Sequence, residues 1–192
     1  ITSNYNLLIH PLITTCGIKV NNIHFLEIGC GDGKYGLNIS KNVEHYSGVD
    51  IRINALKKAR ETLKNQSNCD LYKNDGETLS QFKDNSQHII FSYQTLFFLP
   101  NIEIIESYLK EVFRVLSDNG IAKIQLSGPC MKKGFRISWI SIARINPLWK
   151  LLRIIPGNFQ IPILKFKPPK TDWGKWGAFI NPLKSIKLIE KM

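Results

Sequence analysis

The chain has 192 residues, a net charge of +11 and 43% hydrophobic residues, a balance typical of one soluble α/β domain with a single large core. No apolar run reaches the roughly 18 residues that a membrane span needs. The four cysteines are scattered, without a C-x-x-C pair, which argues against a zinc site and against a disulfide scaffold. We therefore predict no metal and reduced thiols in the cytoplasm. Since the first residue is Ile1, a removed leader or tag stays open.

The positive charge is concentrated toward the C-terminus. Residues 1–128 hold 13 Lys and Arg against 13 Asp and Glu, whereas residues 129–192 hold 13 against only Asp172 and Glu190. This asymmetry predicts an anionic partner or surface for the last third of the chain.

Predicted strands and helices alternate along the first 128 residues. Apolar, β-branched segments predict strands, and apolar residues at helical spacing predict helices. The predicted strands cover 24–29, 45–50, 69–74, 87–93 and 121–126, the last after a turn at 118–120. The predicted helices cover 33–41, 53–65 and 101–116, the last capped by Asn101. Such alternation implies right-handed crossovers and a parallel sheet with helices on both faces.

Three glycines at every second position follow the first predicted strand. Gly29, Gly31 and Gly33 can take positive φ and leave the backbone bare, so that a ligand can touch the main chain. The helix expected next offers unpaired N–H groups to a negative group. A purely structural turn needs one or two glycines, so three at this spacing favour a nucleotide-type cofactor.

The acid Glu27 followed by G-x-G-x-G resembles the first motif of the class I S-adenosylmethionine-dependent methyltransferases. The dinucleotide fingerprint, G-x-G-x-x-G, places its third glycine one residue later, so a nicotinamide dehydrogenase is disfavoured. The resemblance implies a Rossmann-like, doubly wound, mostly parallel sheet, S-adenosylmethionine as the cofactor and an enzyme that transfers its methyl group. It covers about residues 24–128 and includes the segments 75–79, 83–86, 96–101 and 109–120.

The ends of the predicted strands carry the candidate cofactor residues, because open parallel sheets bind ligands beyond their carboxyl ends. Asp50 could accept both ribose hydroxyls, and Asp75 could accept from an adenine amine, although Asp75 with Gly76 is also typical of a plain turn. The resemblance implies that Glu27 and the glycine loop hold the methionine portion. The predicted cofactor residues are Glu27, Gly29, Cys30, Gly31, Gly33, Asp50, Ile51, Asp75, Gly76, Glu77 and Ser92.

Methyl transfer mainly needs alignment of a nucleophile with the methyl group, because a sulfonium is already a good leaving group. The sequence identifies no residue as a general base. Tyr93 and Gln94 are candidates for lining the acceptor pocket, and His10 is a candidate on an N-terminal lid. Two residues depart from the family pattern: His88 replaces an Asp, and Phe98 replaces the His of many small-molecule enzymes. The simpler interpretation of His10 and His88 is an ordinary hydrogen-bonded histidine.

After residue 128 the sequence changes character. Residues 129–180 combine large apolar and basic side chains, and the apolar residues of 135–155 recur at helical spacing. We interpret this segment as a basic helical lid inserted after the fifth strand; contact with an anionic membrane or with nucleic-acid phosphates is the alternative. Residues 181–192 predict a last helix, and the C-terminus is expected to be incomplete because the final strands of the family do not follow.

These observations predict a single methyltransferase domain over residues 1–192 that methylates a small or lipid-like acceptor. An RNA or tRNA methyltransferase that uses the basic C-terminal third is the first alternative. A non-catalytic partner subunit with a methyltransferase fold is the second. We expect the protein in the cytoplasm, with peripheral membrane contact as a further option.

Overall fold

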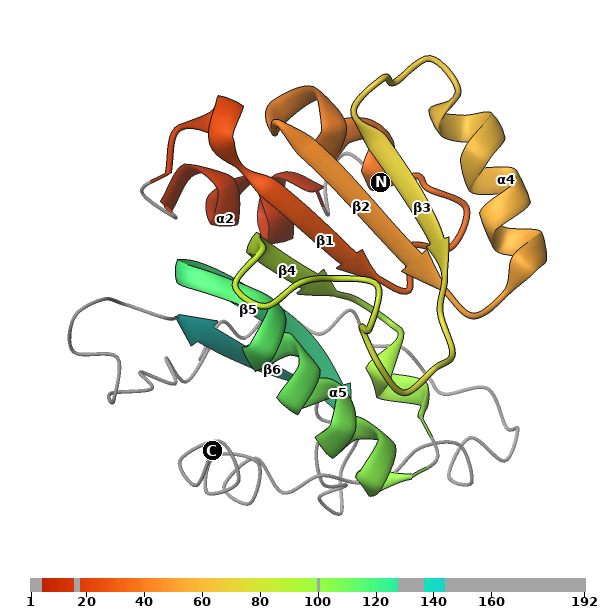
Figure 1. The fold of residues 1–192 in the computed structure, drawn as a ribbon, viewed down its shortest axis with the longest axis vertical. Coiled ribbons are helices and arrows are strands. Elements are labelled where there is room, and N and C mark those ends of the chain that lie inside the picture. The colour runs from red at the N-terminus through yellow and green to blue at the C-terminus, as the bar shows by residue number, and fades with distance from the viewer. Residues whose placement is uncertain (1–4, 16–17, 100, 128–136, 144–192) are drawn as a thin grey trace.

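A computed structural model describes residues 5–15, 18–99, 101–127 and 137–143, which contain one six-stranded sheet (Figure 1). Its order is β3-β2-β1-β4-β5-β6; the first five strands are parallel, and β6 runs antiparallel to β5. Strand order reverses between β1 and β4, and ligands bind open α/β sheets beside such a reversal. The strands are β1 (His24–Ile28), β2 (His45–Asp50), β3 (Cys69–Lys73), β4 (Gln87–Ser92), β5 (Leu116–Ser127) and β6 (Ile137–Ala143).

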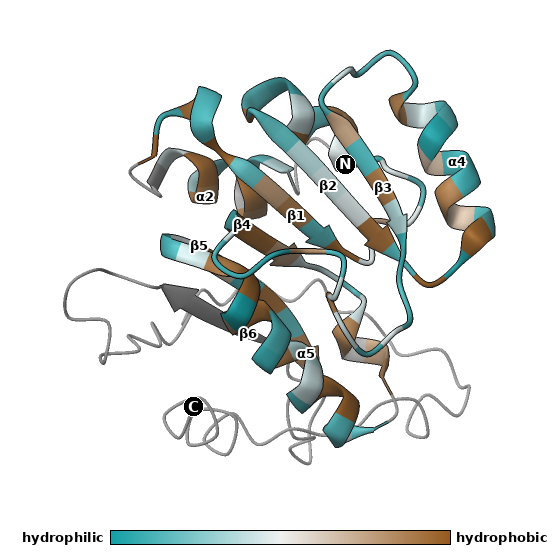
Figure 2. Cartoon of the chain, in the orientation of Figure 1, coloured by the Kyte–Doolittle hydropathy of each residue, from teal (hydrophilic) through white to brown (hydrophobic). Residues whose placement is uncertain are grey.

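Helical segments cover both faces of this sheet. The Asn101 side chain accepts the Glu103 N–H at the start of α5, as predicted for a helix N-cap. Figure 2 shows apolar colours on parts of β1, β4 and β5 and hydrophilic colours on the outer sides of α4 and α5. The described helical segments are η1 (Tyr5–Ile9), α2 (His10–Thr15), η2 (Val20–Asn22), α3 (Gly36–Ile39), η3 (Ser40–Asn42), α4 (Ile53–Leu63), η4 (Leu96–Phe98) and α5 (Ile102–Val115).

The core consists of two apolar layers, one on each side of the sheet. In one layer, Leu109 and Val112 of α5 pack with buried residues of β1, β4 and β5. In the other, Ile9 and Leu12 of the N-terminal helical segment pack with Phe25 of β1 and with residues of β2 and β4. Because both faces of the sheet are covered, the carboxyl ends of its central strands are held in place.

The sequence predicted the first four strands closely. Strand β2 matches its prediction residue for residue, and β1, β3 and β4 each end one residue earlier than predicted. Strand β5 begins earlier, at Leu116, and the predicted turn at 118–120 is an irregularity within it. There the pairing shifts from Gln87 with Leu116 to Ile89 with Ile121, and Asn119 has a φ of 64°.

One predicted helix begins later than expected, and another prediction is wrong. The helix expected over 33–41 is α3, which begins only at Gly36, because Gly33 has a φ of 78° and cannot belong to a right-handed helix. Residues 137–143, expected to be helical, form β6 instead. Their isoleucines are β-branched, and the strand pairs with β5 along its whole length. The rest of the lid predicted over 129–180 and the helix predicted over 181–192 lie outside the described residues.

Candidate cofactor site

The glycine loop joins β1 to α3, and its three glycines have different surroundings. The φ angles of Gly29, Gly31 and Gly33 are 79°, 57° and 78°. A Cβ at Gly29 would lie 1.8 Å from Thr95 Oγ1, and one at Gly33 would lie 3.2 Å from the main chain of α4. A Cβ at Gly31 would meet nothing closer than Arg52 Nη2, at 3.9 Å. Gly29 and Gly33 therefore pack the loop against the protein, and Gly31 leaves main chain open to a ligand.

Amide groups of this loop are used within the chain. The Gly29 and Cys30 N–H groups donate to the Val49 carbonyl oxygen at 2.8 and 3.0 Å, and the Gly33 N–H donates to the Cys30 carbonyl at 3.0 Å. Three N–H groups of α3 likewise donate to carbonyl oxygens of the preceding turn. These bonds do not include the Gly36 N–H at the start of α3, so the offer of helix N–H groups to a ligand stays a prediction, and the open feature of the loop is the space at Gly31.

Asp50 ends β2 beside the loop, and its side chain is buried. Its Oδ2 accepts the Gly31 N–H at 2.9 Å, and its Oδ1 accepts the Arg52 N–H at 2.8 Å. The Arg52 guanidinium donates from Nε to Oδ1 at 3.1 Å and from Nη2 to Oδ2 at 3.2 Å. Burial alone would raise the pKa of Asp50, but these donors outweigh it and hold the pKa below its ordinary value. The ionised Asp50 carboxylate thus lies in hydrogen-bonding contact with Gly31, where the main chain is open.

Glu27 lies in β1, and its buried carboxyl accepts a 2.7 Å hydrogen bond from the Tyr46 hydroxyl of β2. Burial raises the pKa of Glu27 to about 8; the Tyr46 bond opposes the shift, and nearby carboxylates add to it. Two glycines make room for the Tyr46 side chain. A Cβ at Gly36 would lie 2.6 Å from its ring, and one at Gly48 would lie 2.9 Å from its hydroxyl. Burial therefore favours the protonated form of Glu27.

Cys30 contributes main chain to the loop. Burial raises the pKa of its thiol, and the nearby Glu27 and Asp50 carboxyls raise it further. Because the thiolate is the reactive form of cysteine, this neutral, buried thiol is a poor nucleophile.

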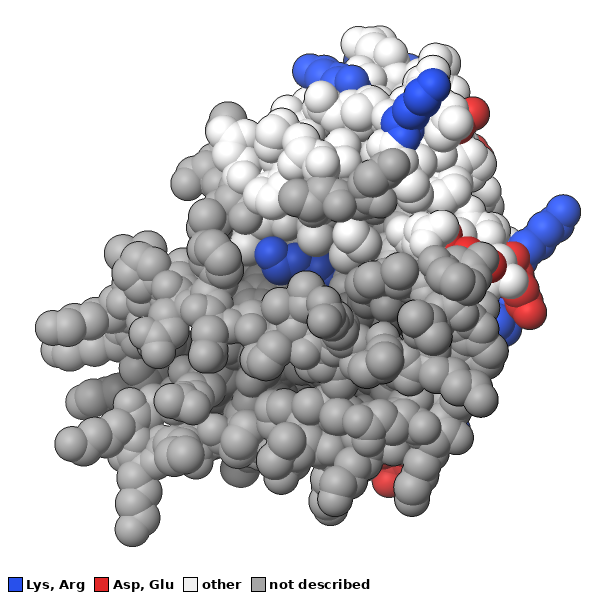
Figure 3. Space-filling view, turned by 90° about the vertical axis from the view of Figure 1, so that its left-hand side faces the viewer, with Lys and Arg blue, Asp and Glu red and all other residues white. Residues whose placement is uncertain are grey.

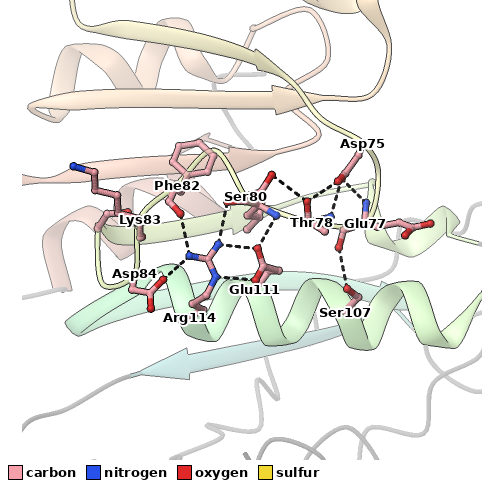
Figure 4. A network of polar contacts seen from close by, with 12 residues as sticks. Asp75, Glu77, Thr78, Ser80, Phe82, Lys83, Asp84, Ser107, Glu111 and Arg114 are labelled. Carbon is pink, nitrogen blue, oxygen red and sulfur yellow. Dashed lines mark hydrogen bonds and ion pairs between the residues drawn. The ribbon is translucent and has the colours of Figure 1, made fainter.

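The loop after β3 carries Asp75, whose carboxylate closes a turn (Figure 4). Its Oδ1 accepts the Glu77 and Thr78 N–H groups at 2.9 and 2.8 Å, and the Thr78 hydroxyl donates to Oδ2. Burial opposes ionisation, but these donors together outweigh it and lower the pKa of Asp75. The turn interpretation is thus correct, and Oδ2 keeps lone-pair capacity for a further donor.

Hydrogen bonds of Asn74 join this loop to α5. Asn74 is buried, donates to the Thr78 carbonyl, and accepts from the Gly76 N–H and from the Tyr108 hydroxyl of α5. A Cβ at Gly76 would lie 3.4 Å from Ile51 Cγ2, so the loop reaches the residue that follows β2. Asp75, Gly76 and Ile51 therefore share one side of the candidate site.

Arg114 of α5 fixes the next part of the chain (Figure 4). Its guanidinium donates to the Leu79 and Phe82 carbonyl oxygens at 3.1 and 3.0 Å and pairs with Asp84 and Glu111. Glu111 in turn accepts the Leu79 N–H at 2.9 Å. Arg114 therefore fixes the second half of the loop between β3 and β4.

The carboxyl end of β4 contributes Ser92 and an aromatic group. Ser92 is fully buried, and its hydroxyl has no hydrogen-bond partner among the described residues. The Tyr93 ring stacks on Phe91, with centroids 6.4 Å apart, and meets Tyr35 edge-on at 6.0 Å. Gln94 is exposed and has a φ of 53°. A buried hydroxyl that lacks a partner is a group that a ligand can satisfy.

The structure brings most of the predicted cofactor residues together and leaves one predicted catalytic residue apart. Asp50 contacts the loop at Gly31, and Ile51 lies against Gly76. His10, in contrast, is exposed in the N-terminal helical segment, where its ring meets Tyr5 edge-on at 6.4 Å. No described contact joins His10 to the strand ends.

Sequence reasoning missed Arg52 and Tyr46. Both hydrogen bond to predicted site residues, Arg52 to Asp50 and Tyr46 to Glu27. A cation two positions after a strand-end acid was the available signal for Arg52. Nothing in the sequence pairs Tyr46 with Glu27, because that contact follows from the register of β1 and β2.

In the part of the chain that the structure describes, no three His, Cys, Asp or Glu side chains gather as metal ligands would. Nor is any helix there long and apolar enough to cross a membrane. On the face in Figure 3, the described Lys and Arg side chains lie in separate patches.

Comparison with known proteins identifies the family. A methyltransferase domain family model matches residues 26–124, just over half of the chain. The chain therefore belongs to the methyltransferases, of the class I S-adenosylmethionine-dependent type that its glycine loop predicted. The expected cofactor, S-adenosylmethionine, agrees with this membership.

Individual relatives share the core but not the full length. A demethylmenaquinone methyltransferase of Staphylococcus carnosus (strain TM300) is 34% identical over 120 residues, which are 58% of this chain and 48% of the relative. The chain thus spans about half the length of this curated relative. The YcgJ protein of Bacillus subtilis has a TM-score of 0.56 at 23% identity over 67% of this chain and 52% of its own. A SAM-dependent methyltransferase of Aquifex aeolicus has a TM-score of 0.55 at 21% identity, over 70% and 72%. These structures share the predicted fold.

Proposed function

We propose that this chain binds S-adenosylmethionine between the glycine loop and the ends of β2, β3 and β4, and transfers its methyl group to a small, lipid-like acceptor. The observation that carries the proposal is the buried, ionised Asp50 carboxylate bonded to the N–H of Gly31, where the main chain is open. The cofactor's adenosine carries a ribose with two adjacent hydroxyls. A carboxylate can accept a hydrogen bond from each of them.

The other parts of the cofactor have candidate partners on both sides of Asp50. Ile51 is 54% exposed and lies against Gly76, so it offers an apolar surface to the adenine ring. Asp75 Oδ2 has capacity for the exocyclic amine of that ring. An apolar side chain and a hydrogen-bond acceptor thus lie at adjacent strand ends, and this arrangement supports the adenine-binding roles that the family resemblance implies.

The methionine portion is proposed to lie at the glycine loop and Glu27. Burial raises the pKa of the Glu27 carboxyl to about 8 and so favours its protonated form when no ligand is near. A cationic amine or sulfonium brought near it would favour its ionised form. Ser92, whose buried hydroxyl lacks a partner, is proposed to hydrogen bond to the same ligand.

The acceptor is proposed to pack beyond β4, against Tyr93 and Gln94. The half-buried Tyr93 and Tyr35 rings meet edge-on there, above the buried Phe91 ring of β4, and aromatic side chains of this kind suit a flat, apolar acceptor. The relative from Staphylococcus carnosus is a demethylmenaquinone methyltransferase, and its name supports an acceptor of the same quinone-like, lipid-soluble class. Gln94 can position the acceptor, because its N–H is fixed by a 2.8 Å bond to the buried Gln125 side chain.

The chemistry asked of the protein is mainly positioning. The cofactor supplies an activated methyl group on a sulfonium. The chain's residues hold the adenosine end, exclude water and align the acceptor, which together are worth up to about 7–11 kcal/mol of the barrier. We assign no general base.

Calorimetry with S-adenosylhomocysteine, followed by a methyl-transfer assay with reduced demethylmenaquinone, tests this proposal. Asp50→Asn should weaken binding about tenfold or more, because each charge-assisted hydrogen bond is worth about 1.5–3 kcal/mol. Asp70→Asn, which changes an exposed carboxylate of β3, should leave binding unchanged. Equal affinity of Asp50→Asn and the wild type would overturn the ribose assignment. Binding without transfer to the quinone would overturn the acceptor class only.

A further inference from the structure

The Asp50 carboxylate is already saturated by donors of the chain itself. Each oxygen accepts two: Oδ1 accepts from Arg52 N and Nε, and Oδ2 accepts from Gly31 N and Arg52 Nη2, all within 3.2 Å. An ionised carboxylate has about four lone-pair positions. Two of these donors are backbone N–H groups, which fix the carboxylate. The other two belong to one side chain, Arg52.

A ribose would need the positions that the Arg52 side chain holds. Its two hydroxyls require two acceptor positions, and only the guanidinium can leave without unfolding the loop or the start of α4. The Arg52 side chain is 67% exposed, whereas Asp50 is 3% exposed. Displacement of this arginine therefore returns a guanidinium to water without opening the core.

The same guanidinium also lies near the open glycine. The nearest atom of any non-adjacent residue to a Cβ added at Gly31 would be Arg52 Nη2, at 3.9 Å. Arg52 thus occupies both features that the cofactor is proposed to use, the acceptor positions on Asp50 and the approach to the bare main chain.

We propose that Arg52 is a displaceable occupant of the ribose site that lowers the affinity of the chain for its cofactor. This inference rests on the proposed function, because it takes Asp50 as the ribose acceptor. The arginine competes with the ligand for one carboxylate, and binding includes the cost of breaking that ion pair.

The test is calorimetric titration of S-adenosylhomocysteine into the wild type, Arg52→Ala, Arg52→Lys and Arg60→Ala. This probe lacks the sulfonium charge, so salt acts mainly on the protein's ion pair. Arg52→Ala should bind up to about fivefold more tightly, the range set by exposed ion pairs. Arg52→Lys should fall between, because lysine lacks the two-pronged fork of arginine. Arg60→Ala removes the same charge from an exposed position of α4 and should match the wild type.

The salt dependence of binding distinguishes this competition from a purely structural role of Arg52, which would not change with salt. Raising the salt concentration should tighten binding to the wild type, because it screens the Arg52–Asp50 pair, and should have no such effect on Arg52→Ala. Unchanged or weaker binding of Arg52→Ala would overturn the competition. If the wild type fails to bind the probe, both the proposed function and this inference are overturned. If the wild type binds and Arg52→Ala binds with the same affinity, only this inference is overturned.

Discussion

The Tyr46 hydroxyl donates a 2.7 Å hydrogen bond to the Glu27 carboxyl, and both groups are buried in adjacent strands. The bond joins the motif acid to the second strand of the sheet. It exists because Gly36 and Gly48 leave room for the tyrosine side chain. Burial and the neighbouring Glu27 both raise the pKa of Tyr46, so the phenol stays a hydrogen-bond donor.

Replacement of Tyr46 by Phe should destabilise the fold. The change leaves the buried Glu27 carboxyl without its donor, and an unsatisfied buried polar group costs about 1–3 kcal/mol. Urea unfolding followed by circular dichroism measures the loss. Tyr72→Phe, which removes a hydroxyl bonded to the exposed Asp70, should change the free energy of unfolding by less than about 0.5 kcal/mol. Equal effects of the two substitutions would contradict the importance of the Tyr46 bond.

Glu27 should make the ligand-free protein less stable as pH rises. Its carboxyl ionises near its ordinary value of 4.5 in the unfolded chain but at about 8 in the folded one. Between these values the unfolded chain has released the proton that the folded chain keeps, so the free energy of unfolding falls by up to about 1.4 kcal/mol per pH unit. The contribution is complete below pH 4.5 and absent above pH 8. Chemical unfolding from pH 5 to 9 should show this decline in the wild type relative to Glu27→Gln; parallel curves would refute it.

His88 should stabilise the fold more at high pH than at low pH, which is the opposite of the pH dependence expected for Glu27. Its Nδ1 accepts the His24 N–H at 3.0 Å, and burial, with the His24 charge, lowers its pKa below 6.5. The contribution is therefore present above pH 6.5 and lost as pH falls below it. NMR titration of the imidazole measures the pKa. His88→Asn, whose side-chain oxygen can accept the same bond, should lose this pH dependence; an unshifted pKa in the wild type would refute the account.

Gly29→Ala should destabilise the fold by about 2–5 kcal/mol, the sum of a left-handed φ and an overpacked contact. The added Cβ would lie 1.8 Å from Thr95 Oγ1. Thr95→Gly in the same chain removes the clash but not the backbone strain, so the double variant should recover part of the loss. Thermal unfolding of the two single variants and the double variant measures this coupling; additive effects would mean that Thr95 does not oppose a Cβ at Gly29.

The sequence predicted those parts of the site that depend on local pattern. Asp50 was proposed because an apolar segment ends in an acid, and Gly31 because the three glycines are spaced for a turn. Arg52 was missed because its pairing depends on where α4 begins, at Ile53, and Tyr46 was missed because its partner lies on another strand. The segment 137–143 was misjudged because its isoleucines fit helical spacing, while pairing with β5 makes it a strand. His88 is the ordinary hydrogen-bonded histidine of the simpler interpretation.

The most direct test of the central claim is the affinity of Gly31→Ala for S-adenosylhomocysteine, measured with its free energy of unfolding. The φ of 57° makes alanine cost about 1–2 kcal/mol, but no described atom lies closer than 3.9 Å to the added Cβ, so the chain should still fold. We predict a folded variant that binds at least about tenfold more weakly, because the methyl group fills the space in front of the bare main chain. A folded Gly31→Ala that binds as tightly as the wild type would contradict the account.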